Sequence, residues 1–131
     1  MDATLREQIR ERAGFRCEYC RLPEAFALNP FHLDHVLPSF HGGGDGAENR
    51  ALSCAPCNAR KGTNLSGIDP DSGRVCELFN PRKQIWTEHF VMVSGHIRGR
   101  TAAGRTTVWV CDMNESERLR LRRKLSLSGL I

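Results

Sequence analysis

The sequence predicts a small α+β protein, on three observations. Residues 4–13 are charged and amphipathic, which is typical of a helix, and Gly14 provides a natural end to it. Short apolar segments bounded by proline or glycine follow, which is typical of strands joined by turns. Residues 114–125, "NESERLRLRRKL", are expected to close the chain as a basic helix. Terminal helices with short strands between them indicate the α+β class.

The first half of the chain is expected to contain a strand, a loop, a return strand and a helix, in that order. The strand is expected at "FHLDHV", because Pro30 precedes it and Pro38 follows it closely. Three consecutive glycines and an Asp-Gly pair make "HGGGDGAEN" a loop. The segment "RALSC" predicts the return strand, and "APCNARKG" predicts a short helix that Gly62 stops.

The second half is expected to be a β-rich tail that ends in the basic helix. Residues 63–74 carry many turn residues, and the segments after them alternate or run apolar in the manner of strands. Three strands are therefore expected, at "QIWTEHFVMV", "HIRGRT" and "TTVWVC". We expect residues 1–66 to form a core and residues 67–131 to pack on it as an extension, in a single compact unit.

Composition limits the class of protein. No apolar run approaches the roughly 20 residues that cross a bilayer, and the N-terminus lacks the apolar stretch of a signal peptide. The expected location is the cytoplasm, where thiols stay reduced, and no membrane partner is expected. The net charge of +4 comes entirely from residues 67–131, where eleven Lys or Arg oppose seven Asp or Glu. This excess is a mild indication of a polyanionic partner.

Four of the six cysteines form two Cys-x-x-Cys pairs, Cys17/Cys20 and Cys54/Cys57. This spacing allows four thiolates to occupy the corners of one tetrahedron, the geometry of structural Zn²⁺ sites. A redox pair and four buried thiols are the alternatives, but a redox motif belongs near a βαβ unit and none is visible. With four sulfur ligands the ion has no open position for a substrate, so it would stabilise a small core and do no chemistry.

Between and just after these pairs lie Asp34-His35, Asn49 and Asn58. The motifs "CEYC", "LDHVLP", "HGGGDGAEN" and "CAPCNARKG", in this order, resemble the HNH endonuclease family over about residues 15–62. The later "LFNPRKQIWTEHF" and "GRT" resemble the tail of a subgroup of small bacterial HNH proteins. The resemblance implies a ββα-metal (His-Me finger) core. It also implies an endonuclease that hydrolyses phosphodiester bonds, with double-stranded DNA expected and with 5′-phosphate and 3′-hydroxyl products.

The resemblance assigns a role to each matching residue. His35 would be the general base, because imidazole accepts and returns protons near neutral pH. Asp34 and Asn58 would hold a catalytic Mg²⁺ or Mn²⁺, since these ions prefer carboxylate and amide oxygens. Asn49 would brace the loop and help to orient the base. Adjacent strand residues point to opposite faces, so Asp34 and His35 need a twisted or ending strand to share one site.

Three further residues are candidates for phosphate contacts or for supporting the site. His32 is expected either on the other face of the strand or behind the metal ligands. His41, beside Gly42, is expected to position the loop or to touch the scissile phosphate. Lys61 lies one turn past Asn58 on the expected helix and is expected to contact a phosphate.

Three residue pairs outside the motif are expected to be ordinary structural residues: His89 and His96 as polar residues, Trp86 and Trp109 as core anchors, and Cys76 and Cys111 as buried or half-buried thiols. The cations of residues 118–124 are expected to form a solvated helix face, with contact to a nucleic-acid backbone as the alternative. The competing hypothesis for the whole chain is a non-catalytic, zinc-containing module that binds nucleic acid. The complete Asp34, His35, Asn49 and Asn58 set favours the enzyme, because a pure binder has little need for all four.

Overall fold

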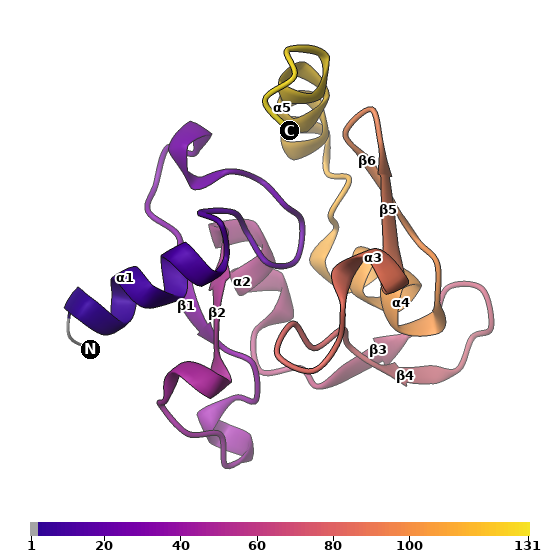
Figure 1. Ribbon diagram of the computed structural model, residues 1–131. Helices are drawn as coiled ribbons and strands as arrows, with labels where there is room; N and C mark the ends of the chain where they lie inside the picture. The colour runs from indigo at the N-terminus through magenta and orange to yellow at the C-terminus, as the bar shows by residue number, and fades with distance from the viewer. Residues whose placement is uncertain (1–2) are drawn as a thin grey trace. The chain divides into compact units, whose positions relative to one another are not determined.

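The computed structural model describes residues 3–131, and the chain divides into two compact units. The first comprises Met1–Leu65 with Asn80–Gln84, and the second comprises Ser66–Phe79 with Ile85–Ile131. Both units combine short antiparallel strands with helices, which confirms the α+β class (Figure 1). The packing of the second half on the first as one compact unit stays a prediction.

The first unit is built on a two-stranded hairpin with a helix on either side of it in sequence (Figure 1). Its elements are α1 (Ala3–Arg12), β1 (His32–His35), β2 (Arg50–Ser53) and α2 (Ala55–Lys61), with 3₁₀ turns at Glu24–Phe26, Ser39–His41 and Ala47–Asn49. The strands pair antiparallel, with Leu33 opposite Leu52 and His35 opposite Arg50. The expected hairpin and both flanking helices are therefore confirmed, and α2 ends where Gly62 adopts a positive φ of 51°.

The core of the first unit is small. Besides the four paired cysteines, its buried apolar side chains are Ile9, Ala13, Tyr19, Leu22, Phe31, Ala51 and Leu52. Glu18 is also buried, and its Oε2 accepts a hydrogen bond from the Leu52 amide (2.9 Å). Arg82 forms an ion pair with the same carboxylate, and this ties residues 80–84 to the unit. A core of this size needs such additional restraints, because small domains bury too little apolar surface to be stable without them.

The second unit contains two hairpins and three helices (Figure 1). Its elements are β3 (Ser66–Ile68), β4 (Val75–Glu77), α3 (Trp86–His89), β5 (Phe90–Val93), β6 (His96–Gly99), α4 (Ala102–Cys111) and α5 (Ser116–Leu127). Strand β3 pairs with β4, and β5 pairs with β6. The expected strand at 84–93 is only partly correct, because it begins as a helical turn. That turn allows Trp86 to stack on Phe90, with ring centroids 5.0 Å apart.

The strand expected at "TTVWVC" is wrong, because these residues form the second half of α4. Thr101 caps this helix, since its hydroxyl accepts a hydrogen bond from the Gly104 amide (3.1 Å). The buried Thr106 and Thr107 then donate their hydroxyls to the carbonyls of Ala102 and Ala103, at 2.7 Å each. The polar atoms of these β-branched residues are thus satisfied within the helix, so the local strand preference is overridden.

Two side-chain expectations for the second unit also need correction. Trp109 is 70% exposed and is not a core anchor, whereas Trp86 is buried as expected. Arg118 and Arg122 are 4% and 0% exposed, so the basic helix α5 is not simply a solvated face. Arg118 donates to the carbonyl of Cys111 at the end of α4 (2.8 Å). Arg118 thus acts as a structural donor, because the last carbonyls of a helix have no partners within it.

Replacing Arg122 with methionine is expected to destabilise the second unit by about 2–4 kcal/mol. Its Nε donates to the Gly95 carbonyl (2.8 Å), and its Nη2 donates to the Met113 carbonyl (2.6 Å). The substitution would leave both buried acceptors without these donors, which costs about 1–3 kcal/mol each. Urea denaturation measures the change, with the exposed Arg120→Met on the same helix as the control. Equal stability of the two variants would contradict the structural role of Arg122.

Among the described residues, no helix combines the length and the apolar character that crossing a membrane requires.

Candidate metal centre and active site

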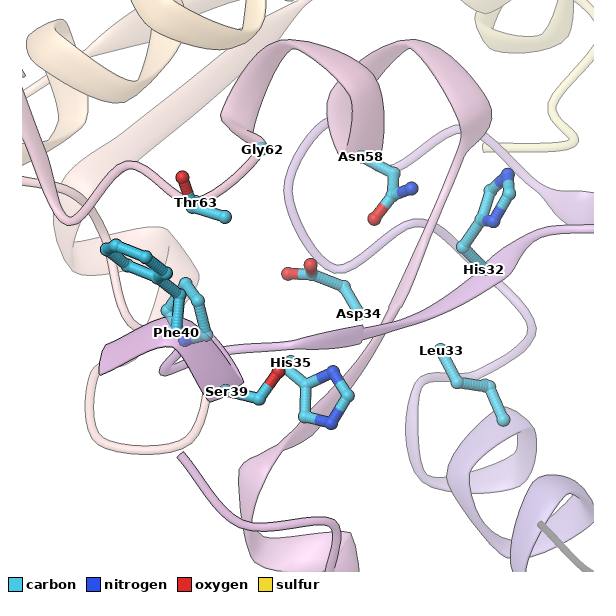
Figure 2. A pocket seen from close by; sticks show the side chains of 10 residues that line it. His32, Leu33, Asp34, His35, Ser39, Phe40, Asn58, Gly62 and Thr63 are labelled. Atoms are coloured by element: carbon cyan, nitrogen blue, oxygen red, sulfur yellow. The ribbon is translucent and has the colours of Figure 1, made fainter. Parts of the chain in front are cut away.

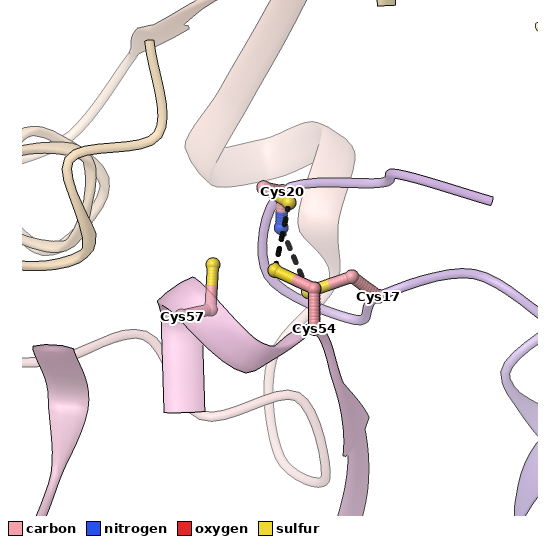
Figure 3. Close-up of side chains that lie close together, drawn as sticks. All are labelled: Cys17, Cys20, Cys54 and Cys57. Carbon is pink, nitrogen blue, oxygen red and sulfur yellow. Dashed lines mark hydrogen bonds between the residues drawn. The ribbon is translucent and has the colours of Figure 1, made fainter. Parts of the chain in front are cut away.

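The four paired cysteines form one cluster at the end of β2 (Figure 3). Their sulfur atoms all lie within 4.8 Å of one another, and the Sγ atoms of Cys20 and Cys54 are 3.6 Å apart. Zn–S bonds of about 2.3 Å in a tetrahedron place the sulfurs about 3.8 Å apart. The cluster therefore has the ligand type, number and spacing that a structural Zn²⁺ requires.

The surroundings of the cluster suit a cation. The Cys20 amide donates a hydrogen bond to Cys17 Sγ (3.4 Å), and the Arg21 amide donates to the Cys17 carbonyl (2.9 Å), which closes a tight turn. Burial, with hydrogen bonds from Cys20 and Cys54, raises the pKa of the Cys17 thiol well above its ordinary value. A thiolate at this position is therefore favourable only beside a positive charge, which a bound metal ion supplies.

Asp34 lies in β1 with its carboxylate largely buried. Its Oδ2 accepts a hydrogen bond from the Tyr19 hydroxyl (3.1 Å) and forms an ion pair with Lys61 Nζ (3.1 Å). Burial raises the pKa of Asp34, while the Lys61 and Tyr19 contacts oppose that rise. In Figure 2 the carboxylate points into the space bordered by Asn58 and Thr63. The Asp34 carboxylate is thus held by Tyr19 and Lys61, and it also borders the pocket.

His35 is the last residue of β1, and its ring lies on the opposite side of the strand from Asp34 (Figure 2). Both residues nevertheless line one pocket of about 300 Å³. The two adjacent side chains leave β1 on opposite faces, as the pleat of a strand requires, and His35 borders the pocket from the end of the strand. Its Nε2 lies 2.7 Å from Asp45 Oδ1, and its carbonyl accepts a hydrogen bond from Lys61 Nζ (3.1 Å).

The other walls of the pocket come from α2, from the start of β1 and from the turn after it. Asn58 extends from α2 toward Asp34, and His32 lies on the same side of β1 as Asp34 (Figure 2). His32 and Asp34 are two residues apart, so the pleat of the strand places them on one face. The residues that line the pocket therefore include an aspartate, an asparagine and two histidines, with the exposed Phe40 among them.

Asn49 braces the loop that follows His35. Its Nδ2 donates to the carbonyls of Leu37 (2.9 Å) and Gly44 (2.7 Å), and its Oδ1 accepts from the Leu37 amide (2.8 Å). Its own carbonyl accepts from the Val36 amide (2.9 Å). The loop is packed so closely that a Cβ at Gly43 would lie 1.7 Å from the Leu37 carbonyl oxygen. Only glycine fits at this point, and the chain leaving His35 is held in place.

Two of the supporting candidates have defined partners. His41 Nε2 lies 3.2 Å from the Thr63 carbonyl oxygen, so this ring ties the turn at Ser39–His41 to the chain after α2. Lys61 is 3% exposed, and its ammonium contacts both the Asp34 carboxylate and the His35 carbonyl. Lys61 therefore supports the two site residues from the interior and does not present its charge at the surface.

Three residues that contact the site are not indicated by any motif in the sequence. Tyr19 lies between the first two zinc cysteines, Asp45 lies in the glycine loop, and Arg50 lies opposite His35 in the hairpin. Arg50 donates to the Leu33 carbonyl (3.0 Å) and contacts Asp45 Oδ1 (3.4 Å). The only local signal was the Asp-Gly pair at residues 45–46, which marks a turn but does not specify a side-chain partner.

An antiparallel hairpin followed by a helix, with Asp-His at the end of its first strand, is the arrangement expected of a ββα-metal core. Residues 17–64 match the model of the HNH endonuclease family, so this segment is an HNH domain and the resemblance over about residues 15–62 is confirmed. The family indicates a nuclease-type function and a nucleic-acid substrate.

Among characterised proteins, the chain is similar to the Septu protein PtuB of Bacillus thuringiensis, with 27% identity over 111 residues. The match covers 83% of this chain but 40% of the relative, so the chain spans well under half the length of the protein it resembles. No solved structure matches the chain.

Proposed function

We propose that this protein is a metal-dependent HNH endonuclease that hydrolyses phosphodiester bonds, with double-stranded DNA as the expected substrate. One observation supports the proposal above the others: Asp34, His35 and Asn58 line the same pocket. Together they offer a proton acceptor and two oxygen ligands, which is what hydrolysis of a phosphodiester requires. The zinc cysteines lie outside this set and would have a structural role.

In this proposal, His35 takes a proton from the water molecule that attacks phosphorus. Its backbone is held by the hairpin, by Lys61 and by the loop that Asn49 braces, so the ring starts from a fixed position. The oxygen ligands offered by Asp34 and Asn58 fit Mg²⁺ or Mn²⁺, since both are hard donors. Such a cation would supply positive charge at the phosphate and at the leaving oxygen.

Lys61 and Tyr19 would keep the carboxylate of Asp34 ionised and correctly directed. A buried carboxylate without partners tends to take up a proton, and both contacts act against this. The Asp34 and Lys61 pair also explains why this lysine is buried, since a buried ammonium needs a nearby negative charge.

Cleavage of supercoiled DNA is expected to require Mg²⁺ or Mn²⁺ and to stop in EDTA at concentrations that leave the zinc in place. Changing Asp34 to asparagine is expected to lower the rate about 100-fold or more, because it removes the anionic ligand. Mn²⁺ binding, followed by electron paramagnetic resonance, should weaken in parallel. If cleavage is undiminished in EDTA, or in the Asp34→Asn variant, the pocket does not hold a catalytic cation.

The control for this experiment addresses folding. Asp34→Asn leaves Lys61 buried without its partner, which by itself can destabilise the domain. The double variant Asp34→Asn/Lys61→Met removes both charges, and it is expected to recover stability without recovering cleavage. A folded, zinc-loaded wild-type protein that binds DNA but cuts it with neither cation would favour the non-catalytic binding module.

A further inference from the structure

The glycine-rich loop brings a carboxylate to His35. Asp45 lies ten residues after His35, and its Oδ1 is 2.7 Å from the ring Nε2. This is the distance of a strong, charge-assisted hydrogen bond. Because a carboxylate only accepts, the shared proton belongs to Nε2, and Nδ1 is then the nitrogen with the free electron pair.

The backbone around Asp45 is held on both sides. Asn49 donates to the carbonyl of the preceding residue, Gly44 (2.7 Å), and Arg50 Nε donates to the carbonyl of Asp45 itself (3.3 Å). Arg50 also contacts the Asp45 carboxylate, and its own carbonyl accepts a hydrogen bond from Arg12 (2.7 Å). The carboxylate is therefore placed by a braced segment, although it lies in a loop of glycines.

The contact between Asp45 and His35 is expected to contribute little to the stability of the fold. The Asp45 side chain is 85% exposed, and pairs this exposed contribute little to folding because water screens them. The hydrogen bond with His35 lowers the pKa of Asp45 below its usual range, so the carboxylate is ionised at neutral pH. The nearby Arg50 offsets this negative charge, which would otherwise repel a polyanionic substrate.

We propose that Asp45 is a positioning residue for His35, and this inference rests on the proposed nuclease function. Asp45 holds the Nε2–H group, so the ring is kept in one tautomer and one orientation with Nδ1 available to water. In the reaction a proton moves from water to Nδ1, and the hydroxide oxygen bonds to phosphorus. The bond from phosphorus to the 3′ oxygen breaks, and that oxygen takes a proton from solvent. The Asp45 charge stabilises the imidazolium until it returns its proton to solvent.

The test compares Asp45→Ala and Asp45→Asn with Glu48→Gln, which removes a charge from the same loop at an exposed position. Both Asp45 variants are expected to lower kcat about 10- to 100-fold with KM little changed, while Glu48→Gln retains the wild-type values. The high exposure of Asp45 means that the variants are expected to keep their zinc and their melting temperature.

Long-range ¹H–¹⁵N spectra of the histidine rings provide a second readout that a purely structural role would not change. With the ring neutral, wild-type His35 is expected to be a single tautomer with its proton on Nε2, and Asp45→Ala is expected to show a mixture. His35→Ala identifies the signals. Unchanged kcat and a single tautomer in Asp45→Ala would refute the role of Asp45, as would a change confined to KM.

These results separate the two proposals. If His35→Ala is inactive but Asp45→Ala cleaves normally, the inference about Asp45 is wrong and the endonuclease proposal stands. If His35→Ala cleaves as fast as the wild type, the proposed mechanism itself fails, and the assignment of Asp45 fails with it.

Discussion

Replacing His35 with alanine is expected to lower the rate of DNA cleavage by about 100- to 10,000-fold, which is the usual contribution of a general base. A methyl group cannot take the proton from the attacking water. The proposed cation ligands, Asp34 and Asn58, remain in the pocket, so the loss should fall on kcat. Single-turnover cleavage of a supercoiled plasmid, with protein in excess, measures the chemical step.

The matched control for this variant is His96→Ala. His96 is an exposed histidine at the start of β6 in the second unit, and the proposed mechanism does not use it. Its variant is expected to cleave at the wild-type rate, and both variants should retain about one zinc per chain. Equal rates for His35→Ala and the wild type would rule out His35 as the base.

Replacing Cys54 with serine is expected to unfold the first unit. Structural zinc sites contribute apparent binding energies of about 10–16 kcal/mol in zinc-finger peptides, a large amount compared with the stability of a small domain. The four cysteines are at most 1% exposed, so replacing one of them removes a zinc ligand from the interior of the unit. Circular dichroism and zinc content report the loss.

The control for the cysteine variant is Cys76→Ser. Cys76 is a half-buried thiol on β4 in the second unit, so its replacement should leave zinc content and melting behaviour unchanged. Chelation of zinc from the wild type should reproduce the Cys54→Ser result. A Cys54→Ser protein that stays folded without zinc would show that the cluster does not stabilise the domain.

The elements around the cysteines could be predicted because their signals are local. Pro30 and Pro38 flank β1, and Gly62 adopts the positive φ that ends α2. The failure at α4 has an equally definite cause. A run of threonine and valine favours a strand locally. Here, however, the Thr101 side chain caps a helix, and the buried hydroxyl groups of Thr106 and Thr107 find acceptors among the carbonyls of the same helix.

The same contrast applies to side chains. Trp86 followed the rule that tryptophan is a core residue, whereas Trp109 lies 70% exposed on α4. The basic run of α5 suggested a solvated face, yet Arg122 is fully buried because the carbonyls of Gly95 and Met113 need a donor. Which charges of a helix enter the core depends on the acceptors that face it, and these lie on other elements.

By itself, the sequence determined that the chain carries a four-cysteine metal site and the Asp-His motif of an HNH domain, because the spacing of these residues along the chain defines both. Only the tertiary structure decided which groups surround the site. It placed Lys61 beneath Asp34, and it brought Asp45 to His35 across the loop. The physical reason is that hydrogen bonds and ion pairs form between atoms within about 3–4 Å in space. His35 and Asp45, 10 positions apart, and His35 and Lys61, 26 positions apart, reach that distance only after the hairpin and α2 have packed together.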